Sequence, residues 1–258
     1  MKIHEYGENH SDIAVLIHPS AVRWDYFEYV IPYLQERFHL IIPALPGYDE
    51  TEDSSYTSVE KIAAELEEWL IVHGCRRIAC AYGCSMGGSI VTRMLADGRL
   101  DIGSAVIDGG ITPYQLPWIV TRMIALRDSG LMYIGKLGGI RLLEKAFDTD
   151  EYSEEDLKYA ADVLKHMSTK TIWNTFESCN NYELPAPVRT ECRHIEYWYA
   201  EKEEKSRKWD IRFMRKTFPE IVLKPFEDLG HGGLAVKQPE IFASEIVRAC
   251  ASSDFDNQ

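Results

Sequence analysis

The sequence has few basic residues: 28 Lys and Arg against 41 Asp and Glu give a formal charge of -13 over 258 residues. Such a charge repels phosphate backbones and anionic lipid surfaces, so no nucleic acid partner is expected. Long apolar runs are also absent. The longest ones, such as Ile13–Ile17, fall far short of the ~20 residues that cross a bilayer. No membrane-spanning segment is therefore predicted.

Two further absences bear on the compartment. Residues Met1–Tyr6 show no basic segment followed by an apolar one, which is the pattern of a secretory signal. The six cysteines are scattered without a C-x-x-C pair, as expected for reduced buried thiols rather than for a disulfide framework. We therefore predict a cytoplasmic protein.

The composition is typical of a globular protein. Hydrophobic residues make up 45% of the chain and charged residues 27%, which excludes disorder as the main state. A chain of 258 residues can bury a sizeable core, and its length fits one large domain or one domain with an insertion.

Apolar runs alternate with helical patterns in the first part of the chain. Short β-branched runs bounded by turns predict buried strands, and apolar residues at helical spacing predict helices. The predicted strands are Ile13–Ile17, Phe38–Ile42, Arg77–Tyr82 and Ile102–Asp108, and the predicted helices are Trp24–Phe38, Val59–His73 and Gly87–Leu95. This alternation indicates β-α-β units, so the predicted fold class is α/β, with a mostly parallel sheet flanked by helices.

The alternation stops after residue 112. Residues 113–190 contain helical patterns, such as Tyr152–Met167 and Ser168–Cys179, without a convincing strand. It then resumes with the strands His194–Ala200 and Ile221–Phe226 and the helices Lys205–Phe218 and Gln238–Cys250. We therefore predict a core domain of residues 1–112 and 191–258, with an all-helical cap of residues 113–190 inserted in it.

Gly83, Ser85 and Gly87 form a G-x-S-x-G segment between a predicted strand and a predicted helix. The pattern alone is weak, and a tight turn with a capping serine is the alternative interpretation. The strand before it and the helix after it favour a sharp turn that exposes a nucleophilic serine, with glycines where the neighbouring backbone leaves no room for a Cβ. Metal-ligand and phosphate-binding motifs are absent, so neither a metal nor a cofactor is predicted.

From Ile13 to Ala249 the sequence resembles the α/β-hydrolase superfamily, whose chain order is serine, acid and histidine. The resemblance implies that Ser85 is the nucleophile. It also implies that His231, in a loop between the last predicted strand and the last helix, is the catalytic histidine. Haloalkane dehalogenases and epoxide hydrolases of this fold use a carboxylate nucleophile, and this chain has Ser85 in that place.

The acid of the implied triad is less sharply defined. The family usually places it in a G-x-x-D turn after the penultimate strand, and the segment Ala200–Glu203 makes Glu203 the matching residue. Alanine replaces the glycine and glutamate replaces the aspartate. The neighbouring Glu201 and Glu204 leave the register open. Asp108, at the end of the preceding core strand, is the family's other location for the acid.

The resemblance also implies an oxyanion hole made of the backbone amides of Met86 and Ser20. Met86 begins a predicted helix, and Ser20 follows the first predicted strand. Pro19 departs there from the family's His-Gly turn, although the Ser20 amide remains able to donate. In this scheme Ser85 attacks a carbonyl carbon, a histidine takes its proton, and the acid orients the imidazole.

These features predict a carboxylesterase-like serine hydrolase that cleaves an ester or thioester of a small to medium, mainly apolar acyl substrate. Cap residues such as Trp118 and Met123 are expected to line the pocket or to pack on the core, and no cationic anchor for the substrate is evident. The alternatives are a serine-dependent lyase, C–C hydrolase or acyltransferase on the same fold, or a non-catalytic ligand-binding relative. The only predicted partner is a small-molecule acyl substrate. The protein is expected to be a monomer or a homodimer.

Overall fold

The computed structural model describes residues 1–113, 116–140, 142, 153–188 and 190–254. Within them, one sheet of seven strands has the order β1-β3-β2-β4-β5-β6-β7, and every neighbouring pair is parallel except β1 with β3. The strands are β1 (Lys2–Tyr6), β2 (Ile13–Ile17), β3 (His39–Ala44), β4 (Arg77–Cys84), β5 (Asp101–Asp108), β6 (His194–Ala200) and β7 (Val222–Phe226). The predicted α/β class with a mostly parallel sheet is confirmed.

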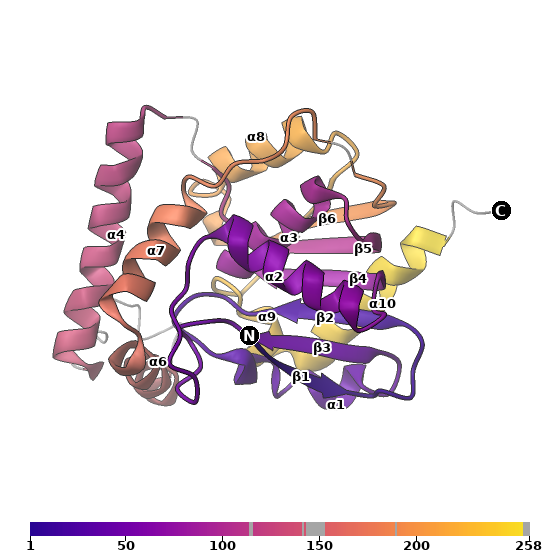
Figure 1. Ribbon diagram of the computed structural model, residues 1–258, viewed down its shortest axis with the longest axis horizontal. Helices are drawn as coiled ribbons and strands as arrows, with labels where there is room; N and C mark the ends of the chain where they lie inside the picture. Colours follow the sequence, from indigo (N-terminus) through magenta and orange to yellow (C-terminus); the bar gives the residue numbers. More distant parts are fainter. Residues whose placement is uncertain (114–115, 141, 143–152, 189, 255–258) are drawn as a thin grey trace.

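Helices cover both faces of the sheet (Figure 1). They are the 3-10 helices η1 (Trp24–Phe27) and η2 (Glu201–Glu203) and the α-helices α1 (Ile31–Leu34), α2 (Val59–Val72), α3 (Met86–Asp97), α4 (Trp118–Gly138), α6 (Glu154–His166), α7 (Thr169–Cys179), α8 (Lys208–Thr217), α9 (Leu234–Lys237) and α10 (Pro239–Asp254).

The sequence of β2 shows why both faces must be covered. Its five residues are all buried, and strands buried on both sides are apolar throughout rather than alternating. Ile13, Val15 and Ile17 belong to the core cluster that includes residues of α2 and α3, whereas Ala14 and Leu16 belong to the cluster that includes residues of α1 and α10. The sheet therefore separates two apolar layers.

The helices α4, α6 and α7 lie between β5 and β6 in the chain, and α4 packs against both α6 and α7 beside the sheet, at the left of Figure 1. Ser153 and Ser168 cap α6 and α7 by accepting hydrogen bonds from the first-turn amides of Asp156 and Thr171. The predicted helical insertion after the fourth core strand is thus present. None of the helices in the described segments combines the length and the apolar character that a bilayer span requires.

Two local predictions were incomplete. The strand β1 was missed because its residues are partly exposed at the sheet edge, where it pairs antiparallel with β3 and carries no continuous apolar run. The predicted helix Trp24–Phe38 is wrong as a single element, since the chain forms only η1 and the short α1 there. Pro32 lies in the first turn of α1, where its missing N–H breaks no hydrogen bond.

Parallel topology brings distant loops together. The segments that follow β2, β4, β5, β6 and β7 all leave the same edge of the sheet, which is where open α/β sheets bind their ligands. Ser20, Ser85, Glu203 and His231 all lie in these segments.

Candidate active site

The turn between β4 and α3 carries Ser85 in a strained backbone conformation, with φ 51 and ψ -111. A non-glycine residue with positive φ persists only where the surrounding structure enforces it, and such strain concentrates at functional sites. The Ser85 amide donates to the carbonyl of Asp108 at the end of β5, 2.8 Å away. This hydrogen bond to the end of β5 fixes the turn at the edge of the sheet.

The glycines on either side of Ser85 are required by packing. A Cβ on Gly83 would overlap the Gly87 carbonyl, and a Cβ on Gly87 would overlap the Ile17 carbonyl at the end of β2. Backbone atoms cannot move aside as a flexible side chain can, so only glycine fits at either position. The same closeness brings the turn after β2 beside the turn that carries Ser85.

The two predicted oxyanion donors lie on these adjoining turns. Met86 is the first residue of α3, and Ser20 belongs to the turn that follows β2. Neither backbone N–H has a hydrogen-bond acceptor among the described residues. Next to them His18 is fully buried, and burial lowers its pKa to about 4, so its imidazole is neutral at physiological pH.

The structure brings the predicted histidine and acid together. Oε2 of Glu203 lies 3.1 Å from Nδ1 of His231. The imidazole lies against Gly109, where the backbone has φ 54 and an added Cβ would overlap the ring. Because Gly109 directly follows Asp108, the residue that binds the Ser85 amide, the ring is held at the strand end beside the nucleophile turn. Among the described contacts, the Ser85 hydroxyl has no hydrogen bond to His231, so that last link remains a prediction.

The pKa of Glu203 is lowered from its ordinary value. Burial on its own raises this pKa, but the hydrogen bond with His231 and the positive charge of Arg207 lower it by more. Glu203 is therefore a carboxylate at neutral pH, as an acid that stabilises an imidazolium must be.

The competing acid, Asp108, has a different partner. The Tyr82 hydroxyl donates to its Oδ2 at 2.7 Å, and no hydrogen bond joins its side chain to His231 among the described residues. Burial raises the pKa of Asp108, and the Tyr82 bond and the charge of His231 counter this only in part. Asp108 is near enough to His231 to interact electrostatically, but Glu203 is the carboxylate that contacts the ring.

Arg207 is a site residue that sequence reasoning missed. Its Nη2 lies 3.4 Å from Oε1 of Glu203 and 3.2 Å from Nδ1 of His231, and its Nη1 lies 3.5 Å from Oδ2 of Asp210. A guanidinium only donates hydrogen bonds, so it cannot bond to an Nδ1 that already carries a proton. The arrangement is consistent when Nδ1–H donates to Glu203, which leaves Nε2 as the base, and Arg207 holds Glu203.

Arg207 is a cation of the site, but its contacts are with Glu203, His231 and Asp210, so it does not test the expectation that the substrate has no cationic anchor. It stands four residues after Glu203, which is a spacing that allows an ion pair on one helical turn. This spacing could be read from the sequence, but the neighbouring Glu201 and Glu204 made the pairing of Glu203 ambiguous. Asp210 in turn accepts from the amide and the hydroxyl of Thr112, at 2.9 and 2.8 Å, so this network ties α8 to the segment after β5.

The loop around His231 is held in place by contacts of Gly232 with Tyr26 and Cys84. The Tyr26 hydroxyl donates to the Gly232 carbonyl. Gly232 has φ 66, and a Cβ there would overlap the sulfur of Cys84. Cys84 is fully buried, and burial raises the pKa of its thiol well above the ordinary value. It is therefore a protonated packing residue and not a competing nucleophile.

Cap residues depart in part from their expected places. Trp118 and Met123 are each 67% exposed and are not part of the described core clusters, and neither lines the pocket described next. Tyr133 and Phe176 do pack against the core cluster. A pocket of about 510 Å³ lies between the segment after β5 and α8, lined by Thr112, Pro113, Leu116, Val188, Trp209, Arg212, Phe213, Lys216 and Thr217. It adjoins the Arg207 network through Thr112.

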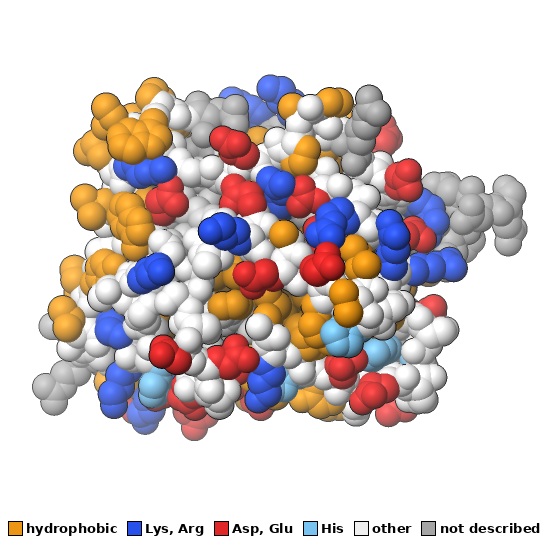
Figure 2. Space-filling model, viewed as in Figure 1, with side chains coloured by type: hydrophobic (Ala, Val, Ile, Leu, Met, Phe, Trp, Pro, Cys, Tyr) orange, Lys and Arg blue, Asp and Glu red, His pale blue; other side chains and the backbone are white. Residues whose placement is uncertain are grey.

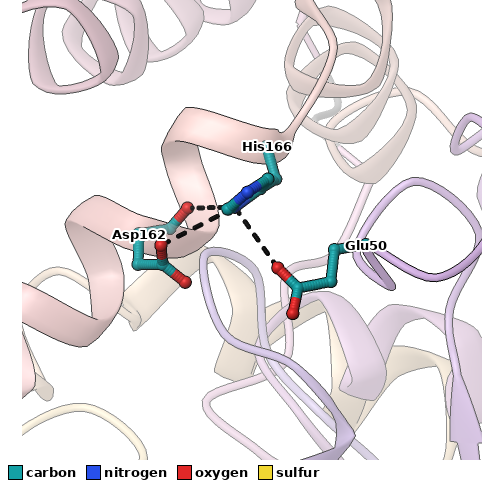
Figure 3. A group of neighbouring side chains, drawn as sticks. All are labelled: Glu50, Asp162 and His166. Carbon is teal, nitrogen blue, oxygen red and sulfur yellow. Dashed lines mark hydrogen bonds and ion pairs between the residues drawn. The ribbon is translucent and has the colours of Figure 1, made fainter.

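Figure 3 shows a second polar group, in which Glu50, Asp162 and His166 lie close together on the surface. Their atoms are close enough to share a metal ion, but Arg23 already contacts both carboxylates, at 3.2 Å for Glu50 and 2.7 Å for Asp162. The hydrogen bond from Arg23 lowers the pKa of Asp162. We interpret this group as a polar contact between α6 and the loops of the core.

Comparison with known proteins agrees with the geometry. Residues 14–245 match the model of the alpha/beta hydrolase family, and the chain belongs to that family. No curated protein sequence matches the chain.

Several solved structures share the fold. An alpha/beta hydrolase family protein from Desulfitobacterium hafniense is 21% identical, with 96% of this chain and 99% of that chain covered and a TM-score of 0.75. MenH from S. aureus is 17% identical, with 98% of each chain covered and a TM-score of 0.76. A carboxylesterase from Nitrososphaera gargenis is 17% identical, with 99% and 95% covered and a TM-score of 0.77. Others are described as an epoxide hydrolase and a bromoperoxidase, so the shared fold does not select one reaction.

Proposed function

We propose that the protein is a serine hydrolase that cleaves a carboxylic ester or thioester through an acyl-enzyme on Ser85. The observation that carries the proposal is the pairing of Glu203 with His231 at 3.1 Å beside a strained turn that presents a serine. The same edge of the sheet supplies two backbone amides without acceptors among the described residues, which is what an oxyanion requires.

In the proposed reaction, Nε2 of His231 takes the proton of Ser85 as the serine oxygen attacks the carbonyl carbon. Glu203 accepts the hydrogen bond from Nδ1–H, fixes the tautomer and stabilises the imidazolium. The amides of Met86 and Ser20 bind the oxyanion. The imidazolium then protonates the leaving alcohol or thiol, and a water activated by the same imidazole releases the acid.

A mainly apolar acyl group is the proposed substrate class. The pocket beside Thr112 has apolar walls contributed by Leu116, Val188 and Phe213, which suit an acyl chain of modest length. Arg212 and Lys216 also line it, and Ser85 and His231 are not among its lining residues. Support for ester cleavage rather than epoxide opening comes from the nucleophile position, which holds Ser85. A hydroxyl requires an external base such as His231, whereas a carboxylate nucleophile does not.

The proposal is tested with p-nitrophenyl esters of graded chain length and with a fluorophosphonate label. The wild-type protein should hydrolyse the esters and label on Ser85, and the Ser85→Ala variant should lose both properties, with a fall in kcat of about 10³-fold or more. Ser89→Ala is the matched control, because Ser89 lies one turn along the same helix and its hydroxyl donates to the Ile111 carbonyl rather than to a catalytic residue. Labelling that persists in Ser85→Ala would refute the proposal, as would saturable ester binding without turnover in the wild-type protein.

A further inference from the structure

The pocket between α8 and the segment after β5 is lined by one face of α8. The α8 residues in its lining are Trp209, Arg212, Phe213, Lys216 and Thr217. They recur at helical spacing and, at about 100° per residue, occupy a single sector of the helix about 140° wide. A continuous face of α8 therefore borders the pocket.

The pocket has the size of a small-molecule site and an apolar wall. Its volume of about 510 Å³ lies within the ~300–1,000 Å³ that is typical of such sites. Val188 and Phe213 pack against the core cluster and also line the pocket, and Leu116 completes the apolar wall. An apolar chain or ring can therefore be removed from water there.

The charged part of the lining is positive. Arg212 and Lys216 lie four residues apart on α8, where like charges repel each other. Within the described part of the chain, neither forms an ion pair with a carboxylate, and none of the described lining residues is acidic. The protein has 41 acidic residues against 28 basic ones, yet these two neighbouring cations lack an acid. A bound anion would relieve their repulsion.

Arg212 is positioned by an aromatic ring. Its Cζ lies 5.2 Å from the centroid of the Trp209 ring, and a cation–π contact with the ring face leaves N–H groups at the edge of the guanidinium able to donate to an anion. Trp209 is 58% exposed. Figure 2 shows Lys and Arg side chains beside hydrophobic ones along the top of the molecule, where Figure 1 places α8. A ligand can therefore reach these cations from solvent.

The polar groups of Thr112, which also lines the pocket, are already used within the protein. Its amide and its hydroxyl both donate to Oδ1 of Asp210, at 2.9 and 2.8 Å. Asp210 in turn pairs with Arg207 at 3.5 Å. This carboxylate is thus balanced by a different cation, and Arg212 and Lys216 remain to recognise the charge of a ligand.

We propose that this pocket binds a small amphipathic anion. Its apolar chain or ring packs along Val188 and Phe213, and a carboxylate or phosphate group at its end contacts Arg212 and Lys216. Where this anion is the acyl part of the substrate, the inference rests on the proposed function and adds a negative charge at the far end of the acyl group. The two cations then supply the substrate anchor that the sequence alone did not reveal.

Isothermal titration calorimetry of the full chain tests the binding. Octanoate should bind more tightly than octanol, which has the chain without the charge, and more tightly than inorganic phosphate, which has the charge without the chain. Octyl phosphate, compared with octanoate, shows which anionic group the cations prefer. Arg212→Gln and Lys216→Gln should each weaken the binding of octanoate by about fivefold or more, because each removes one charge-assisted contact.

Two variants serve as controls. Arg215→Gln removes a cation of the same helix that is exposed and lies outside the lining, so this variant should bind octanoate as the wild type does. Ser85→Ala should also bind octanoate normally, because Ser85 is not a lining residue. Circular dichroism confirms that each variant remains folded.

Kinetics test whether the anion belongs to the substrate. The monoester of p-nitrophenol with suberic acid carries the distal carboxylate that p-nitrophenyl octanoate lacks. The ratio of kcat/KM for the suberate ester to kcat/KM for the octanoate ester should fall by about fivefold or more in Lys216→Gln. In Arg215→Gln this ratio should equal that of the wild type.

Separate results would overturn the separate parts. Octanoate that binds no more tightly than octanol refutes the site, and so does octanoate binding that both Arg212→Gln and Lys216→Gln leave unchanged. An unchanged ratio of the two esters in Lys216→Gln refutes the assignment to the substrate. A protein that binds octanoate through the two cations but cleaves neither ester refutes the proposed function and supports the binding site.

Discussion

The turn that carries Ser85 is held by backbone packing, whereas the pair of Glu203 and His231 is held by side chains from separate loops. On the first side, the Gly83 and Gly87 positions have no room for a Cβ. For the pair of Glu203 and His231, the side chains are 19% and 26% exposed, they contact each other directly, and Arg207 contacts both. The two halves of the site therefore tolerate change in different ways.

The difference shows how the site divides its requirements. Strain at a nucleophile turn must be resisted by atoms that cannot relax, and carbonyl groups of neighbouring strands meet that requirement. An acid–histidine pair must instead adjust its protonation, and side-chain partners can set that through charge and burial. Substitutions in the turn that carries Ser85 should act on folding. Substitutions of the residues around Glu203 and His231 should act on activity and its pH dependence.

Glu203→Gln should have the largest effect on activity. The amide keeps the size of the side chain but loses the charge that stabilises the imidazolium, so kcat should fall by about 10³- to 10⁴-fold with little change in folding. Asp108→Asn is the control, because Asp108 contacts Tyr82 rather than His231. It should cost less than about tenfold. Steady-state kinetics on both variants decides between the acids, and a greater loss in Asp108→Asn would reverse the assignment.

Gly87→Ala should act on folding. The new methyl group would overlap the Ile17 carbonyl, and the free energy of unfolding should fall by about 3 kcal/mol or more. Gly130→Ala places the same methyl group in open space on α4 and should stabilise the protein by up to about 1 kcal/mol. Urea denaturation measures both. Equal stability of Gly87→Ala and the wild type would show that the nucleophile turn is not fixed by its backbone neighbours.

Arg207→Gln should change the pH dependence more than the rate at neutral pH. Arg207 helps to hold the pKa of Glu203 below its ordinary value, so this pKa should rise in the variant. A carboxyl group with a lowered pKa contributes stability that is present above its unfolded pKa and is lost as pH falls. In the variant, activity should be lost at higher pH because Glu203 becomes protonated there, and the stability that Glu203 contributes at neutral pH should be smaller than in the wild type.

Titration of Glu203 by carbon NMR, in the wild type and in Arg207→Gln, measures the change directly. Asp210→Asn is the control, because it removes the other carboxylate bound to Arg207 and leaves the pair with Glu203 in place. The pKa of Glu203 should not rise in that control. An unchanged pKa in Arg207→Gln would show that His231 alone sets the charge state of the acid.

The fold could be predicted well wherever a segment is buried on both faces. β2 is apolar throughout and was predicted with its observed limits. A strand that is covered on both faces of a parallel sheet has no exposed polar positions, so its apolar run is continuous. β1 was missed, since an edge strand with a partly exposed face shows no such run. The segment from Trp24 to Phe38 has helical spacing, but it forms only short helical turns.

The candidate site was predictable where its signal is local. Ser85 is identified by two glycines within four residues, since the sharp turn needs them. Glu203 and His231 were inferred from a family resemblance, because 28 residues separate them and nothing local joins them. Arg207 was missed for a different reason, since it lies only four residues after Glu203, inside a run of charged residues in which no single ion pair stands out. Its importance lies in its ion pair with Glu203 beside His231, which only the folded structure shows.

The sequence by itself determined the layered α/β architecture and the nucleophile turn, because periodic burial and glycine requirements act over a few neighbouring residues. Only the tertiary structure decided which carboxylate contacts His231, which cation holds that carboxylate, and which cations line the pocket beside α8. Those outcomes depend on loops that meet at the edge of the sheet and on helices packed from distant parts of the chain.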